Sequence, residues 1–171
     1  MPAPGTIDAR LAGLLRAGRR PRRTAGFSRV GDYGGIWFAL GGTMSVLGEA
    51  RRRSVWRAAT GRVAAAYALN TAVKLAVRRR RPDGGLVSTP TQLSFPSAHA
   101  ATSFAGARAY SRAGGPPAAL YLLAFGLAVS RLRLGVHHPS DVLAGAVLGL
   151  LIGGTSPTLP GGFAGEGPAR R

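Results

Sequence analysis

The sequence contains no cysteine and very few acidic residues. The absence of cysteine excludes disulfides, thiolate metal sites and cysteine nucleophiles. Only 6 aspartate and glutamate residues stand against 23 lysine and arginine residues, which gives a formal net charge of +17. Lys74 is the one lysine among these cations. So strong a positive balance indicates a polyanionic partner, such as nucleic acid, anionic lipid or a phosphate group.

Long hydrophobic runs are also rare, but shorter apolar blocks recur along the chain. Most are shorter than the roughly 20 residues of an ideal spanning helix, and each would also fit a buried helix of a soluble bundle. Their number, and the arginine clusters between them, favour a membrane bundle. The sequence therefore predicts an all-α, polytopic membrane helix bundle with five spanning helices, over residues 34–49, 55–77, 96–111, 118–130 and 139–154.

A short amphipathic segment, residues 7–18, precedes these blocks. It places Ile7, Leu11, Leu14 and Leu15 on one helical face. Because so short a helix cannot span a bilayer, we expect it to lie in the membrane interface. The expected organisation is a basic N-terminal segment that ends in a linker, one membrane domain and a flexible Gly/Pro-rich tail. Their boundaries are 1–33, in which an arginine-rich run over 19–23 is followed by the linker, then 34–155 and 156–171.

Three short motifs contain all three histidines of the chain. The first ends the second predicted helix, the second opens the third helix at Pro96, and the third joins the fourth helix to the fifth. Because consecutive spans run in opposite directions, all three motifs meet at one end of the bundle. The motifs are Lys74 followed after six residues by Arg81-Pro82, then Pro96-Ser97-Ala98-His99, then Ser130-Arg131 with His137 and Asp141.

These residue types suit the binding of a phosphate group. Arginines make planar, bidentate contacts to phosphate oxygens, and a lysine supplies a compact charge. A serine offers a hydroxyl, and the backbone amides in the first turn of a helix attract anions. The phosphate-binding residues predicted on these grounds are Lys74, Arg81, Ser97, Ala98 and Arg131.

The same motifs hold groups that could react with the phosphorus atom. His137 and Asp141 are four residues apart at a helix start, so the carboxylate can reach the ring. An aspartate in that position fixes the tautomer and stabilises the imidazolium, which leaves the other ring nitrogen free to attack. His99 is then the natural general acid for the leaving oxygen.

In this order and spacing the motifs resemble those of the type-2 phosphatidic acid phosphatase family of membrane lipid-phosphate phosphatases. Ten of eleven fixed positions match, and the departure is Ala98, where the family has glycine. Alanine keeps its amide, so we expect activity to survive unless this position needs a positive φ. The resemblance implies a phosphohistidine on His137, which Asp141 orients. It also implies that His99 acts as acid and then as base, that Ser130 supports the site, and that no metal or cofactor is needed.

The resemblance implies a membrane phosphatase whose partners are a lipid phosphate and membrane lipids, with no nucleic acid. Within the family, the small size suggests polyprenyl-phosphate metabolism. The chain is most similar to compact actinobacterial members, including decaprenylphosphoryl-phosphoribose phosphatases of cell-wall synthesis. Phosphatidic acid, phosphatidylglycerophosphate and undecaprenyl diphosphate are alternative substrates. Two other classes stay open: a vanadate-dependent haloperoxidase, which shares the phosphate site, and a non-enzymatic basic membrane protein.

The sequence predicts a multi-pass protein of the cell membrane. The distribution of arginine between the two ends of its bundle indicates which end faces the cytoplasm. The end that holds the motifs carries the arginines of residues 10–29 and Arg78–Arg81, and the opposite end carries Arg51–Arg53. The positive-inside tendency leans towards a cytoplasmic active site. Arg78, Arg79 and Arg80 are expected to face lipid headgroups.

Overall fold

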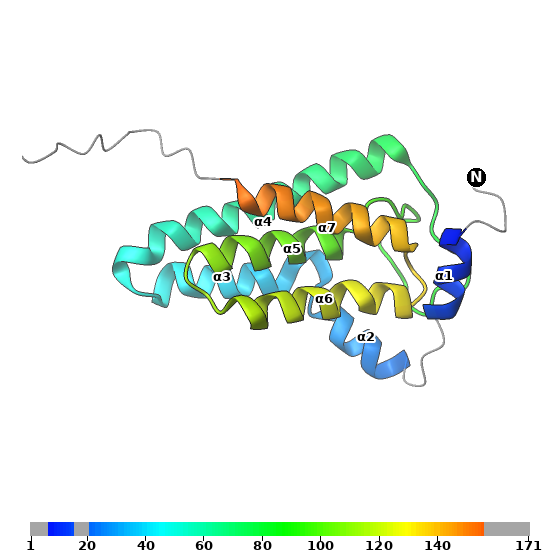
Figure 1. The fold of residues 1–171 in the computed structure, drawn as a ribbon, viewed down its shortest axis with the longest axis horizontal. Coiled ribbons are helices and arrows are strands. Elements are labelled where there is room, and N and C mark those ends of the chain that lie inside the picture. Colours follow the sequence, from blue (N-terminus) through cyan, green and yellow to red (C-terminus); the bar gives the residue numbers. More distant parts are fainter. Residues whose placement is uncertain (1–6, 16–20, 156–171) are drawn as a thin grey trace, which may run out of the picture.

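The computed structural model describes residues 7–15 and 21–155, and the regular elements in these ranges are helices. Figure 1 shows an elongated helical bundle, which is formed by five of the described helices. They confirm the five predicted helical segments, with ends that differ by a few residues. Within the described residues, none of the helices combines the length and the apolar character needed to cross a membrane. The five are α3 (Gly35–Leu47), α4 (Arg53–Val77), α5 (Ala98–Arg112), α6 (Pro117–Arg133) and α7 (Pro139–Gly154).

Helix α5 lies at the centre of the bundle, packed against α4, α6 and α7. An aromatic cluster surrounds its C-terminal half: the ring centroid of Tyr110 lies 6.0 Å from that of Trp37 and 5.1 Å from that of Trp56. The polar groups of these rings are satisfied, since the Tyr110 hydroxyl donates to the Trp37 carbonyl (2.7 Å). The Trp37 indole donates to Ser103 Oγ (3.0 Å). The aromatic core thus joins α3 and α4 to α5, away from the first turn of α5.

Glycines in α7 allow the backbone of this helix to lie in direct contact with the backbone of α5. Adding a Cβ atom at three of them would produce a collision with the α5 backbone, at Gly145 against Ser97, Gly149 against Ala101, and Gly153 against Ala105. Close helix contacts of this kind require small residues. The first turns of the two helices are also joined, because the Ser97 N–H donates to the Asp141 carbonyl (2.9 Å). The close approach therefore places the second motif against the third.

The start of α5 differs from the prediction. Pro96 was expected to open this helix, but the helix begins at Ala98 with Ser97 as its N-cap residue. Pro96 lies before the cap, where its carbonyl accepts a hydrogen bond from Lys74 Nζ (2.9 Å).

Two short helices lie at the end of the bundle where α5 and α7 begin (Figure 1). Helix α1 (Ile7–Leu15) confirms the described part of the segment predicted over 7–18, whose last residues lie outside the described ranges. Helix α2 (Pro21–Arg29) corrects the linker predicted after the arginine-rich run, because residues 24–29 of that linker are helical. Its opening proline suits a first helical turn, and it packs against α6. The predicted tail, 156–171, lies outside the described residues.

Candidate active site

The three motifs meet at the end of the bundle where α4 ends and α5 and α7 begin. A cavity of about 490 Å³ lies among them. The residues of the motifs that line it are Lys74, Arg81, Ala98, His99, Arg131 and His137. Three further predicted residues are buried beside them, namely Ser97, Ser130 and Asp141.

His137 is buried, and its two ring nitrogens face different partners. Nδ1 lies 3.5 Å from Asp141 Oδ2, at the outer limit of a hydrogen bond. Nε2 lies 3.0 Å from Arg81 Nη1. Because a guanidinium group can only donate, Nε2 must accept, and the ring hydrogen is therefore on Nδ1, facing Asp141. Nε2 keeps the lone pair that a nucleophile needs, beside an arginine that lines the cavity.

The surroundings of His137 keep its imidazole neutral. Burial, together with the positive charges of Arg81 and Arg131, lowers the pKa of His137 to about 3, against the opposing interaction with Asp141. The neutral ring is the nucleophilic form, so His137 is ready to react throughout the neutral pH range.

The carboxylate of Asp141 is fully buried and held on both oxygens. Oδ2 accepts a hydrogen bond from the backbone N–H of His138 (2.8 Å) and lies 3.2 Å from His138 Nδ1. Oδ1 accepts from Arg79 Nη1 (3.0 Å). This arrangement fixes the carboxylate beside the ring of His137.

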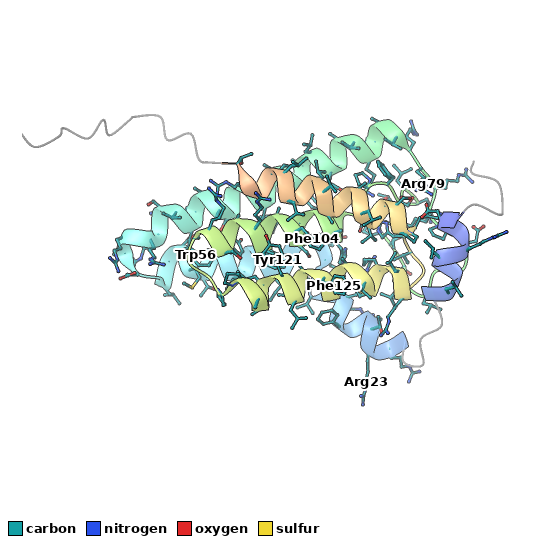
Figure 2. All side chains as sticks on the ribbon, viewed as in Figure 1. Arg23, Trp56, Arg79, Phe104, Tyr121 and Phe125 are labelled. Atoms are coloured by element: carbon teal, nitrogen blue, oxygen red, sulfur yellow. The ribbon has the colours of Figure 1, made fainter. Side chains whose placement is uncertain are left out.

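The sequence predicted that Arg79 faces lipid headgroups, and this prediction is wrong. Helix α4 ends at Val77, and the left-handed conformation of Arg78 (φ 52°) turns the chain there. Arg79 then points inward, to Asp141, whereas Arg78 and Arg80 are exposed. Figure 2 shows Arg79 at the end of the bundle near α1. In a run of four arginines, no sequence signal distinguishes the one that faces inward.

Arg79 also joins the N-terminal helix α1 to the site. Its Nη2 lies 2.7 Å from Asp8 Oδ2, and its Nη1 donates to Ser140 Oγ (2.6 Å). Asp8 in turn accepts from the Ser140 N–H (3.1 Å). Burial alone would raise the pKa of Asp8, but hydrogen bonds from Ser140 and Arg79 outweigh it and hold that pKa below its usual value. Asp8 is therefore ionised at neutral pH and clamps Arg79 from the side opposite Asp141.

Lys74 has no hydrogen left for direct contact with a phosphate. Its ammonium group donates to the carbonyls of Leu93 (3.2 Å), Ser94 (3.2 Å) and Pro96 (2.9 Å). These three bonds use all of its N–H groups. Lys74 therefore holds the loop before α5 in place, and its charge would act on a bound anion through space.

Ser97 and Arg131 each have a buried hydrogen-bond donor that bonds to no other described residue. Ser97 Oγ and Arg131 Nε have no hydrogen-bond partner among the described residues. Buried polar groups of this kind are costly unless a partner satisfies them. The N-terminal amides of α5 lie beside them at Ala98, and such amides favour anions. This set of donors fits the oxygens of a phosphate group.

Ser28 of α2 is a site residue that sequence reasoning missed. It is buried, and its Oγ accepts from Arg131 Nη1 (2.8 Å) and lies 3.0 Å from Ser130 Oγ. Its carbonyl lies 3.1 Å from His99 Nε2. Ser28 thus holds two motifs together, but its arginine-rich segment contains no motif that would have revealed it.

Ala98 does not need the conformational freedom of glycine. Apart from glycines, only Tyr33 and Arg78 have a positive φ among the described residues. We therefore expect Ala98→Gly to change kcat/KM by less than about threefold and to lower stability by at most about 1 kcal/mol. Phosphate-release kinetics and thermal unfolding would measure both effects. A gain in kcat/KM of tenfold or more would mean instead that the alanine methyl obstructs the phosphate.

Comparison with known proteins identifies the family. The model of the PAP2 superfamily matches residues 56–161, which include all three motifs. The chain belongs to the PAP2 superfamily. Its curated relatives include the decaprenylphosphoryl-5-phosphoribose phosphatase of Mycobacterium tuberculosis, 38% identical over 141 residues, which are 80% of this chain and 78% of the relative. The protein of the same name from Mycolicibacterium smegmatis is 40% identical over 122 residues, 69% of this chain and 67% of the relative.

The fold of this chain is shared by solved structures. Aquifex aeolicus LpxE aligns with a TM-score of 0.66 at 24% identity, over 86% of this chain and 93% of that protein. The transmembrane PAP2-type phosphatidylglycerolphosphate phosphatase of Bacillus subtilis aligns with a TM-score of 0.66 at 22% identity, over 85% and 80%. At these identities the likeness establishes the PAP2 helical fold alone.

Proposed function

We propose that this PAP2 phosphatase removes the 5-phosphate of decaprenylphosphoryl-5-phosphoribose, through a phosphohistidine intermediate on His137. The substrate is supported by the 38–40% identity to relatives that carry this name. The chemistry is supported chiefly by one observation, a buried neutral His137 whose Nε2 lone pair lies beside the cavity.

In the first step, Nε2 of His137 attacks the phosphorus atom. Arg81 Nη1, which contacts Nε2 in the free protein, moves to the phosphate oxygens as the substrate enters, and this frees the lone pair. A nitrogen–phosphorus bond forms while the phosphorus–oxygen bond to the sugar breaks. His99 takes up a proton when the negatively charged phosphate binds beside it, and it donates that proton to the departing oxygen, so the sugar leaves as an alcohol. Asp141 stabilises the positive charge that develops on the His137 ring.

In the second step, water releases the phosphate. His99, now unprotonated, accepts a proton from the water as its oxygen attacks phosphorus. The nitrogen–phosphorus bond breaks, inorganic phosphate leaves, and both histidines return to their starting forms. Throughout, Arg131, Ser97 and the first amides of α5 neutralise and orient the phosphoryl oxygens.

A membrane location is part of the proposed function. Large apolar side chains are exposed in rows on the outside of α6 and α7, and exposed apolar surface of this extent marks contact with lipid or protein. The bundle would lie in the bilayer with α1 at the interface, and the arginine-rich active-site end would face the cytoplasm. Reporter fusions at the two termini would test this orientation. The exposed residues are Leu122, Phe125, Leu143, Val147 and Leu151, with Phe125 labelled in Figure 2.

Phosphate release by the detergent-purified protein tests the substrate. The panel contains decaprenylphosphoryl-5-phosphoribose, undecaprenyl diphosphate, phosphatidylglycerophosphate and phosphatidic acid, each with EDTA present. We expect the highest kcat/KM on the phosphoribose lipid and no loss of rate with EDTA. Faster turnover of another lipid would replace the proposed substrate, and inhibition by EDTA would refute a mechanism that needs no metal.

A further inference from the structure

The cavity extends beyond the phosphate-binding residues, and most of the other residues that line it carry a polar group. Eight lining residues lie outside the motifs, and all but Pro90 carry a hydroxyl or a carboxylate group. A hydrocarbon chain would displace water from these groups without replacing its hydrogen bonds, which is unfavourable. A ligand portion rich in hydroxyls would satisfy them. The seven polar residues are Asp32, Tyr33, Tyr67, Thr71, Ser88, Thr89 and Thr91.

Helix α4 carries two of these residues directly above the phosphate site. Tyr67, Thr71 and Lys74 follow one another at helical spacings of four and three, so they lie on one face of α4. The Thr71 hydroxyl donates its hydrogen to the Tyr67 carbonyl (2.9 Å). Its oxygen therefore remains able to accept a hydrogen bond from a ligand hydroxyl.

A strained turn at Tyr33 brings the carboxylate of Asp32 to the cavity. Tyr33 has a left-handed φ of 55° and is followed by Gly34 at 75°. A bulky residue in this conformation is rare and costs free energy, and such strain gathers at functional sites. Packing of the Tyr33 ring does not explain it, since Tyr33 is 64% exposed. The consequence of the turn is that Asp32 and Tyr33 both line the cavity.

The carboxylate of Asp32 lies beside the proposed general acid. Asp32 Oδ1 is 3.3 Å from His99 Nε2, and the Asp32 side chain keeps 46% of its surface exposed. In the proposed mechanism His99 protonates the oxygen that leaves, and Asp32 lines the same cavity beside His99, within reach of the leaving group. One carboxylate can accept hydrogen bonds from hydroxyls of a ribose, as in dinucleotide-binding proteins.

We propose that this wall is a subsite for the sugar that leaves, with Asp32 accepting hydrogen bonds from the vicinal 2- and 3-hydroxyls of the ribose. The inference rests on the proposed function and adds to it the way in which the leaving group is selected. The hydroxyls of Thr71 and Tyr67 contact the same ring from the α4 side. A lipid phosphate whose leaving group has no hydroxyls would bind through the phosphate alone.

The test compares two substrates in two proteins. The substrates are decaprenylphosphoryl-5-phosphoribose and its analogue without the 2- and 3-hydroxyls, and the proteins are the full chain and its Asp32→Ala variant. We expect the native protein to prefer the hydroxylated substrate by about 10- to 100-fold in kcat/KM, mostly through KM. In Asp32→Ala the preference should fall to within about threefold. Any general effect on His99 would appear equally with both substrates and cancel in this ratio.

Matched variants complete the experiment. Asp83→Ala removes an exposed acid that does not line the cavity, and it should keep the native preference. Thr71→Val, at an exposed position of α4, should reduce the preference in part. Equal turnover of both substrates by the native protein, or an unchanged preference in Asp32→Ala, would overturn the subsite while leaving the proposed function intact. Failure of the native protein to hydrolyse either substrate would refute the proposed function and this subsite with it.

Discussion

Replacing His137 with alanine is expected to lower kcat by about 10⁴-fold or more, because in the proposed mechanism His137 is the group that attacks the phosphorus. The neighbouring groups offer no substitute: Asp141 is fully buried and bonded on both oxygens. The stability of the protein should change little by comparison, since the neutral ring of His137 is not part of a strong ion pair. Steady-state phosphate release and thermal unfolding measure the two effects separately.

A single-turnover experiment with labelled phosphate gives the sharper measurement for the same variant. The native protein should form an acid-labile phosphoenzyme within one turnover, and His137→Ala should form none. His138→Ala is the matched control, because the backbone N–H of His138 still holds Asp141 Oδ2 (2.8 Å). It should retain labelling and lose no more than about tenfold in kcat. Labelling that persists in His137→Ala would assign the nucleophile to another residue.

Replacing Arg79 with alanine should cost about 100-fold in kcat and about 3 kcal/mol of stability. The change leaves the buried Asp141 carboxylate without its charged partner, and removing one member of a buried ion pair has a cost of this order. It also removes one of the two residues that bind Asp8, so only Ser140 still attaches α1 to the site through Asp8. Because in the proposed mechanism the Asp141 carboxylate orients the ring of His137, we expect the loss in kcat rather than in KM. Kinetics on the best lipid substrate and denaturant unfolding are the measurements.

Two further variants decide whether Arg79 acts through Asp141. Arg80→Ala changes an exposed arginine of the same run and should leave both kcat and stability almost unchanged. Asp8→Asn removes one partner of Arg79 but keeps the Asp141 contact, so it should lower kcat by less than about tenfold. If Arg79→Ala lost stability but kept its kcat, the arginine would hold the fold together without positioning the carboxylate.

The helices and motifs of this protein were predictable because their signals are local. Apolar blocks bounded by arginine, proline and glycine give helix positions within a few residues, as for α4 and α7. Helix α2 was not predictable in this way, because its sequence is rich in arginine and lacks an apolar stripe. Its stability as a helix depends on contact with α6 and on the buried Ser28, which exist only in the folded chain.

Alternation of helix direction, together with the motif spacing, also placed the predicted phosphate-binding and catalytic residues at one end of the bundle. The sequence did not reveal what each group is bonded to. Lys74, predicted to contact phosphate, has all three N–H groups on backbone carbonyls of a loop about twenty residues away. Those partners depend on how the loop before α5 folds back over α4, and spacing carries no information about that path.

The sequence by itself determined the fold class, the family and the residues of the three motifs, because periodicity and motif spacing are properties of consecutive residues. Only the tertiary structure decided which arginine of the run Arg78–Arg81 bonds to Asp141, and that Asp8, Ser28 and Asp32 belong to the same site. These residues lie roughly 60 to 130 positions from their partners. Helix packing brings them together, through glycine contacts between α5 and α7 and the turn at Arg78. Such contacts involve many residues at once, and no local pattern in the chain encodes them.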